Sequence, residues 1–412
     1  MTGTTALSRA RTVRYTTIVV ALAAIVTVSA VRIVTGADRL TTPGTLRQAL
    51  IAACPILLAG LGGLWAERAG IVNIGLEGQM LLGTWGAAFF AYHHGWLAGI
   101  VGAAVMGLIG GLVHAIATVS FGVDHIISGV ALNIIGLGAV GFLAKSYFDE
   151  LSGGGPRNLS GYPTPPTLTI PGISDGARSL ADQHWFVVSD VSAAVAGATT
   201  NLSILTILTL ALVLLTAWAL WRTSFGLRLR SCGENPQAAE TLGVNVYLYK
   251  YVAVLVSGAF AGLGGAYLTM VSSSSFTVGQ TNGRGYIGLA SMIFGNWRPS
   301  GVLTGALMFG YADGISLLPK NGPLVHALLL LVAVFLLAYS VFKFRAGELT
   351  TAIVVAVIAL GALVWYFTTT RVPSAFTGMT PYVITLFVIS VASQRLRMPA
   401  ADGKPYRRGS AG

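Results

Sequence analysis

Long apolar runs separated by short polar stretches dominate the chain, and they predict helices that cross a membrane. A crossing takes about 20 residues, because each helical residue rises about 1.5 Å. Lipid offers no water to pair backbone donors, so such runs are expected to be helical. The predicted spans are 15–36, 46–66, 71–92, 96–119, 125–147, 203–222, 249–271, 286–297, 300–319, 323–343, 349–369 and 380–394.

Segment 286–297 is too short for a straight crossing. We interpret it as a broken or re-entrant helix, which membranes tolerate only where protein or a water-filled cavity covers the backbone. The predicted fold class is therefore all-α, a polytopic transmembrane helical bundle with broken helices and about 10–12 spans.

Basic residues cluster at the ends of the predicted spans, which is the positive-inside pattern of cytoplasmic segments. The net charge of +11 therefore indicates orientation in a membrane and not a nucleic-acid partner. An even number of spans leaves both basic termini inside. The predicted parts are a cytoplasmic basic N-terminus (1–14), spans 1–5 (15–147), an extracytoplasmic loop (148–202), span 6 (203–222), a central cytoplasmic loop (223–248), spans that include the short broken helix (249–319), an apparent inserted pair of spans (320–370), the last span (371–398) and a cytoplasmic basic tail (399–412).

Composition agrees with a protein embedded in lipid. Apolar residues make up 54% of the 412 residues and charged residues only 9%, whereas a soluble globular chain carries about 25% charge. The 52 glycines also fit, because small residues let membrane helices approach closely. Two distant cysteines, Cys54 and Cys232, give neither a disulfide framework nor a metal-binding spacing.

The sequence patterns of several kinds of catalytic site are incomplete or lie in the wrong setting in this chain. Gly172, Ser174 and Gly176 match the spacing of a nucleophile elbow, but they follow Pro171 in a predicted loop without the strand-turn-helix setting. No histidines show the H-E-x-x-H spacing, and no lysine completes a Walker A loop. We expect no catalytic site, no metal and no cofactor in this chain, so any nucleotide hydrolysis would belong to another subunit.

The central cytoplasmic loop gives the sharpest local signal. Asn235 is a good N-cap, and Pro236 fits the first helical position, where no amide donor is needed. Ala238 and Ala239 favour helix, and Gly243 can end it in a left-handed conformation. The pattern predicts a helix of about two turns, whose small uncharged start suits a groove on another protein. An ordinary connecting loop is the alternative.

Polar residues inside apolar runs are candidates for a solute pathway. Glu77 would cost roughly 2.5–3.5 kcal/mol in mid-membrane, so it should be paired or face a cavity. Three glycines near Asn73 allow a helix to start or unwind there. A polar network that only packs helices is the alternative. The segment 283–301 is either a substrate-facing broken helix or a small-residue packing motif. The candidate pathway residues are Asn73, Glu77, Gln79, Asn133, Phe276 and Arg284.

The external stretch 148–200 is rich in Gly, Pro, Ser and Thr. Loops of this length are usually functional or disordered. It is either a cap that meets an extracytoplasmic binding protein or a plain solvated loop.

Three ordered stretches, 67–78, 233–243 and 283–301, closely resemble motifs of the permease subunits of bacterial ABC importers for nucleosides. Those permeases form one branch of a group that also includes simple-sugar and branched-chain amino-acid permeases. The stretches resemble, in order, the group's early glycine-rich motif, its coupling helix and its late broken helix. The tail, at 381–386 and 403–406, is similar to the nucleoside branch.

The resemblance covers most of residues 46–319 and 380–406 and has two departures. The external stretch 148–200 is long, and residues 320–370 insert two apolar runs before the tail. An inserted pair of spans keeps the C-terminus inside, but it puts the usual span count of the group in doubt here.

The resemblance implies a multi-pass protein of the bacterial cell membrane that moves nucleosides into the cell by alternating access. It implies an ABC ATPase, a second related permease in a heterodimer and an extracytoplasmic substrate-binding lipoprotein as partners, besides the lipid bilayer. An importer of simple sugars or branched-chain amino acids is the first alternative. A secondary carrier is the second, for which Glu77 is the only plausible ion-coupling carboxylate. The residues that the resemblance assigns to coupling with the ATPase are Gly233, Glu234, Asn235, Pro236, Ala238, Ala239 and Gly243.

Overall fold

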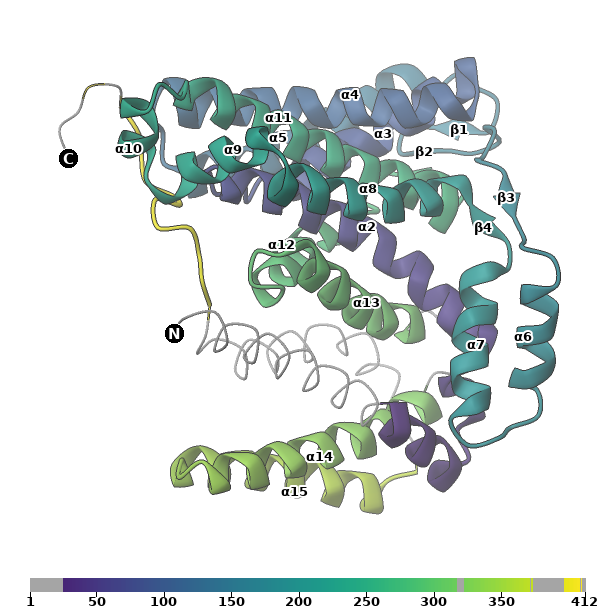
Figure 1. The fold of residues 1–412 in the computed structure, drawn as a ribbon. Helices are drawn as coiled ribbons and strands as arrows, with labels where there is room; N and C mark the ends of the chain where they lie inside the picture. Colours follow the sequence, from purple (N-terminus) through teal and green to yellow (C-terminus); the bar gives the residue numbers. More distant parts are fainter. Residues whose placement is uncertain (1–24, 317–321, 371, 373–395, 408, 410–412) are drawn as a thin grey trace. The chain divides into compact units, whose positions relative to one another are not determined.

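The computed structural model describes residues 25–316, 322–370, 372, 396–407 and 409. The described residues are mainly helical, which confirms the predicted all-α class. Seven of their helices are long and apolar enough to cross a membrane. The predicted span 380–394 lies outside the described residues, as does the first part of span 15–36. The chain forms two compact units (Figure 1).

The larger unit comprises residues 49–168, 201–312 and 381–412. Helices α3, α4 and α11 lie side by side in it, and α4 and α11 each continue into a π-helical turn (Figure 1). Its first long helices coincide with the predicted apolar runs to within about five residues. They are α2 (Pro43–Arg68), which begins in the other unit, α3 (Leu76–His94), α4 (Trp96–Ala115), α5 (His125–Phe148), α8 (Ile204–Arg222) and α11 (Val246–Tyr267).

Glycines set how closely the central helices approach one another. A Cβ added at Gly107 of α4 would overlap the backbone of Gly258 and Gly262 on α11, so only small residues fit this contact. In its most apolar stretch, α2 is 89% buried and α5 only 22%. Helix α2 therefore lies in the core of the unit, whereas α5 presents apolar side chains outward.

Shorter elements complete the larger unit. The predicted short helix is confirmed as α12 (Arg284–Phe294), which begins after Gly283 in a left-handed conformation, φ +78°. Two small antiparallel sheets lie in the loops. The remaining elements are α9 (Ser224–Glu234), α10 (Pro236–Thr241), α13 (Pro299–Ser316), the sheet of β1 (Gly154–Gly155), β2 (Asn158–Leu159) and β5 (Phe276–Thr277) in that order, and the pair β3 (Thr167–Leu168) and β4 (Leu202–Ser203).

The smaller unit comprises residues 1–48, 169–200 and 313–380. It contains a helix at Ile25–Thr35, the 3-10 turn η1 (Asp38–Leu40), α6 (Ile173–Ala181), α7 (Val188–Thr199), α14 (Gly322–Arg345) and α15 (Leu349–Thr368). The last two form a helical hairpin from the apolar runs of the predicted inserted pair, and Ser340 donates to the Ala352 carbonyl between them at 2.7 Å.

The segment predicted as an extracytoplasmic loop at 148–202 contains helices α6 and α7, so it is not a plain solvated loop. Asp190 of α7 is buried and accepts hydrogen bonds from Ser29, at 2.5 Å, and from Thr41. It also forms a 3.2 Å ion pair with Arg32. These contacts with the start of the chain stabilise a helix that local composition does not predict.

Candidate coupling segment and solute pathway

The segment between α8 and α11 folds as two short helices whose ends are set by local capping. Thr223 begins α9, because its hydroxyl accepts from the Gly226 amide at 3.0 Å. Asn235 begins α10, because its side-chain oxygen accepts from the Ala238 amide at 3.0 Å, and Pro236 is the first helical residue. The predicted short helix with an Asn-Pro start is confirmed.

One face of α10 is anchored, and the other exposes the uncharged residues Gln237, Ala238 and Thr241. Ala239 packs with Cys232 and Val246, and burial raises the pKa of the Cys232 thiol to about 11, so the thiol stays protonated at neutral pH. The chain leaves the helix through Gly243 in a left-handed conformation, φ +82°. The neighbouring Leu242 is 85% exposed.

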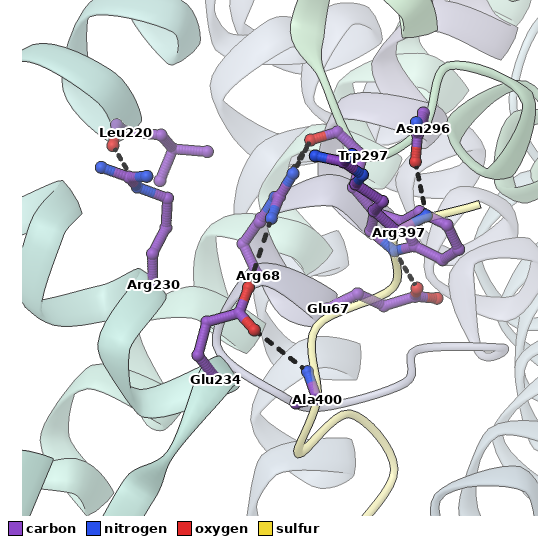
Figure 2. A network of polar contacts seen from close by, with 9 residues as sticks. All are labelled: Glu67, Arg68, Leu220, Arg230, Glu234, Asn296, Trp297, Arg397 and Ala400. Atoms are coloured by element: carbon purple, nitrogen blue, oxygen red, sulfur yellow. Dashed lines mark hydrogen bonds and ion pairs between the residues drawn. The ribbon is translucent and has the colours of Figure 1, made fainter. Parts of the chain in front are cut away.

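The residues before α10 bind other parts of the chain (Figure 2). Glu234 forms a 3.8 Å ion pair with Arg68 and accepts a 3.2 Å hydrogen bond from the Ala400 amide. The Gly233 carbonyl accepts from the Ala401 amide at 2.9 Å. A Cβ at Gly233 would overlap the backbone of Arg68, so glycine is required by this close approach. Gly233 and Glu234 therefore anchor the segment, and α10 carries its exposed residues.

Trp297 joins the end of α2 to the turn after α12 (Figure 2). Arg68 donates to the Trp297 carbonyl through Nε at 3.0 Å and Nη2 at 2.6 Å. The Trp297 indole donates to Glu67 at 2.5 Å. Sequence reasoning missed this cluster. Glu67 and Trp297 both stand in the recognised motifs, but nothing local shows that residues so far apart in sequence are partners.

The Glu77 carboxylate holds the start of α12, which answers the expectation that it is paired. It is buried and accepts from the Thr281 hydroxyl at 2.6 Å. It also accepts from the amides of Gly283, at 2.8 Å, and Gly285, at 2.7 Å. A carboxylate is favoured there because unpaired amides and the helix dipole leave a helix N-terminus positive.

Asn133 of α5 connects the same region to α3. Its side-chain oxygen accepts from the Gly78 amide at 2.8 Å, and its amide donates to the Ile74 carbonyl at 3.0 Å and to the Tyr286 hydroxyl at 2.8 Å. Glu77 and Asn133 both line an open pocket of about 380 Å³. The other residues that line it are Leu81, Val130, Ile134, Leu137, Gly279, Thr281, Asn282 and Tyr286.

Asn73 and Gln79 belong to a separate, fully buried network. The Asn73 amide donates to Gln79 at 3.0 Å and to the Ser257 hydroxyl at 2.8 Å. The network ties the break between α2 and α3 to α11 and does not line the pocket above. This arrangement fits the packing alternative for these two candidates.

The structure does not bring Phe276 into the pocket. Phe276 is fully buried and packs on the Phe148 ring with the ring centroids 5.2 Å apart. Arg284 is half-buried at the first position of α12, where its guanidinium donates to the Thr281 carbonyl at 3.4 Å. Among the residues that the structure describes, no group of three or more His, Cys, Asp and Glu could hold a metal ion.

Comparison with known proteins gives consistent results. Residues 45–338 match the family described as "Branched-chain amino acid transport system / permease component". The chain is 32% identical to a guanosine ABC transporter permease of Bacillus subtilis over 87% of this chain and 95% of that protein. It is 32% identical to a nucleoside ABC transporter permease of Lactococcus lactis over 87% of this chain and 94% of that protein.

A putative glucose ABC transporter permease of Haloferax volcanii is 35% identical over 69% of this chain and 83% of that protein. The same Bacillus and Lactococcus strains each contain a second such permease, named for guanosine and nucleosides, at 27% and 26% identity. No solved structure matches the chain. The chain is a multi-pass cell-membrane protein, and it belongs to the family of branched-chain amino acid transport system permease components.

Proposed function

We propose that the chain is the permease subunit of an ATP-driven importer and that it carries nucleosides into the cell by alternating access. One observation carries the proposal: two relatives that match over 87% of the chain are named for guanosine and nucleosides. The relative named for glucose is slightly more identical but matches only 69% of the chain. A sugar importer of the same architecture is therefore the second candidate.

The pocket beside Glu77 supports a flat, polar solute. Its volume of about 380 Å³ falls in the usual range of small-molecule sites. Tyr286 is 46% exposed and offers a ring face and a hydroxyl, while Asn133 fixes the position of that hydroxyl. Asn282 is exposed at the pocket, and an amide offers a donor and an acceptor that match a nucleobase edge.

The exposed face of α10 supports a cytoplasmic ATPase as the partner that supplies energy. A capped helix with a projecting Leu242 can insert into a groove without burying a charge. ATP would favour one arrangement of the subunits and its hydrolysis the other, so α10 would be displaced in each cycle. The displacement would shift the equilibrium between two states of the spans, because the nucleotide stabilises one state more than the other.

Two further partners complete the proposed transporter. The paired permeases of Bacillus and Lactococcus support a heterodimer with a second, related permease. Ile127, Ile134 and Phe142 of α5 are each more than 60% exposed, so this face needs lipid or a second permease to cover it. An extracytoplasmic binding lipoprotein would deliver the solute.

Uptake by the reconstituted transporter tests the proposal. Proteoliposomes that contain both permeases, the ATPase and the binding lipoprotein should accumulate radiolabelled guanosine only when ATP is supplied. Excess unlabelled nucleosides should compete, whereas ribose, glucose and leucine should not. Competition by a sugar alone would support the second candidate, and equal uptake without ATP would contradict an ATP-driven importer.

A further inference from the structure

The described part of the tail, residues 396–407, runs along the same end of the larger unit as α10. Its Ala401 amide donates to the Gly233 carbonyl at 2.9 Å, in the last turn of α9 and three residues before α10 begins. Further on, the Tyr406 hydroxyl donates to Glu240 in the last turn of α10 at 2.5 Å. The tail therefore holds α10 at both ends, so the helix cannot be displaced without moving the tail or breaking these bonds.

The tail is seated in the protein rather than laid on its surface. Pro399, Ala401 and Asp402 are buried. The Asp402 carboxyl faces Glu67 of α2 and the fully buried Lys250 of α11. Withdrawing a carboxyl group from water is costly unless its neighbours compensate, so the position of Asp402 requires a specific docked arrangement.

Gly70 provides the room for this docking. Its backbone is left-handed, φ +82°, and a Cβ added there would lie 3.2 Å from the Ala401 carbonyl oxygen and 3.5 Å from Lys250 Nζ. A side chain at this position would crowd the tail at Ala401 and the backbone at Gly233, whose Cα would also lie 3.2 Å away.

The tail also binds the turn after α12. The Arg397 amide donates to the Asn296 side-chain oxygen at 2.8 Å (Figure 2). The opposite end of this 11-residue helix is fixed to Glu77, and its third residue is Tyr286, which lines the pocket. Helix α12 and the turn that follows it thus connect the tail to the pocket.

We propose that residues 397–407 form a strap that transmits the displacement of α10 to α12 and, through α12, to the pocket. The inference rests on the proposed function, because it assumes that an ATPase moves α10. Tyr406 and Asn296 are then positioning residues of the transport cycle. They act at opposite ends of the strap and touch no solute.

Two variants test the strap in the complete transporter. Tyr406→Phe removes the hydrogen bond to Glu240 and keeps the ring. Asn296→Gly removes the acceptor for Arg397 and tolerates the left-handed backbone of Asn296, φ +51°. Each should lower the number of solute molecules imported per ATP by about fivefold, the effect of one hydrogen bond, while the ATPase rate and the amount of inserted protein stay within about twofold.

Matched controls separate this role from general packing. Tyr247→Phe makes the same change on a ring 5.4 Å from that of Tyr406, and Asn296→Asp keeps the acceptor oxygen, so both should retain normal coupling. The double variant should be no worse than the poorer single variant, because both interrupt one link. Unchanged coupling in both single variants would overturn the strap, as would a parallel loss of uptake, ATPase rate and protein amount.

Amide hydrogen exchange tests the strap by a measurement that does not depend on transport. In Tyr406→Phe, the amides of Arg397, Ala400 and Ala401 should exchange about fivefold faster, whereas Tyr247→Phe should not change them. Unaltered exchange would refute the strap even if uptake fell. Absence of ATP-driven uptake in the unaltered transporter would instead reject the proposed function, and exchange would still decide whether the tail holds α10.

Discussion

Glu77 links two helices whose sequences lie about half the chain apart, and its contribution can be measured. Glu77→Leu leaves the donors of Thr281, Gly283 and Gly285 without their acceptor, each at about 1–3 kcal/mol. We expect the free energy of unfolding to fall by at least about 3 kcal/mol. Glu77→Gln keeps an acceptor and loses the charge, so a loss of about 1–2 kcal/mol is expected.

Denaturant titration in detergent measures both losses. Glu150→Gln changes an exposed carboxylate beyond the end of α5 and should alter the unfolding free energy by less than about 0.5 kcal/mol. If Glu77→Leu behaved like this control, the carboxylate would not hold α12.

Asp402 should make docking of the tail depend on pH. Burial raises the pKa of its carboxyl from 3.8 to about 7, although the neighbouring Glu67 side chain and Gly403 amide and the charges of Lys250 and Arg68 lower it. The docked tail therefore binds the proton more tightly than a released tail does. This stabilisation is complete below the ordinary pKa and is lost as pH rises through about 7.

We expect the tail to be released more readily at about pH 8 than at about pH 6. Limited proteolysis after Arg407, corrected for the pH response of the protease on an unfolded peptide, measures the release. Asp402→Asn cannot ionise and should show a smaller change between the two pH values. Equal pH responses of the variant and the unaltered chain would exclude Asp402 as the group responsible.

At the scale of elements, α10 is the part that we expect to enter the ATPase. Leu242→Asp places a charge on a side chain that is 85% exposed and should leave the fold intact. A charge opposes insertion into an apolar groove, so both ATPase affinity and uptake should fall about tenfold. Leu227→Asp, on α9 and 62% exposed, is the matched control and should retain both within about twofold. Equal losses in the two variants would mean that α10 is not the specific contact.

Local signals allowed α10 and α12 to be predicted from the sequence, because capping is decided within a few residues. Asn235 and Pro236 start α10, and Gly283 precedes α12. The same reasoning predicted that Glu77 needs a partner but could not identify the amides of α12. Burial of Phe276 was also missed, because the ring that covers it, Phe148, lies on another helix.

Helices α6 and α7 are elements that local composition did not predict. Their segment is rich in Gly, Pro, Ser and Thr, so composition favours a loop. Asp190 nevertheless binds Ser29, Thr41 and Arg32, and such tertiary contacts outweigh a weak local preference. The sequence does not show this pairing, because its partners are about 150 residues earlier in the chain.

At the scale of the whole molecule, an apolar pattern identifies α2 in the core but does not identify every buried helix. Helix α3 is not among the seven helices apolar enough to count as spans. It is nonetheless almost wholly buried and carries Glu77, Gln79 and Thr84 inside the protein. A helix surrounded by other helices can bury polar groups that bind one another, so hydropathy alone does not fix the number of spans.

The hydrogen bonds that Glu77 accepts also predict the energy source of transport. A secondary carrier needs a carboxylate that is free to bind and release a coupling ion within the membrane. Glu77, the candidate for that role, is occupied by three donors that hold α12. Uptake into ATP-loaded proteoliposomes should therefore stay within about 20% when ionophores collapse the proton and sodium gradients, and it should stop when ATP is removed. If uptake instead followed the ion gradient, Glu77 would have to release those donors in each cycle, and its role as a fixed cap of α12 would be untenable.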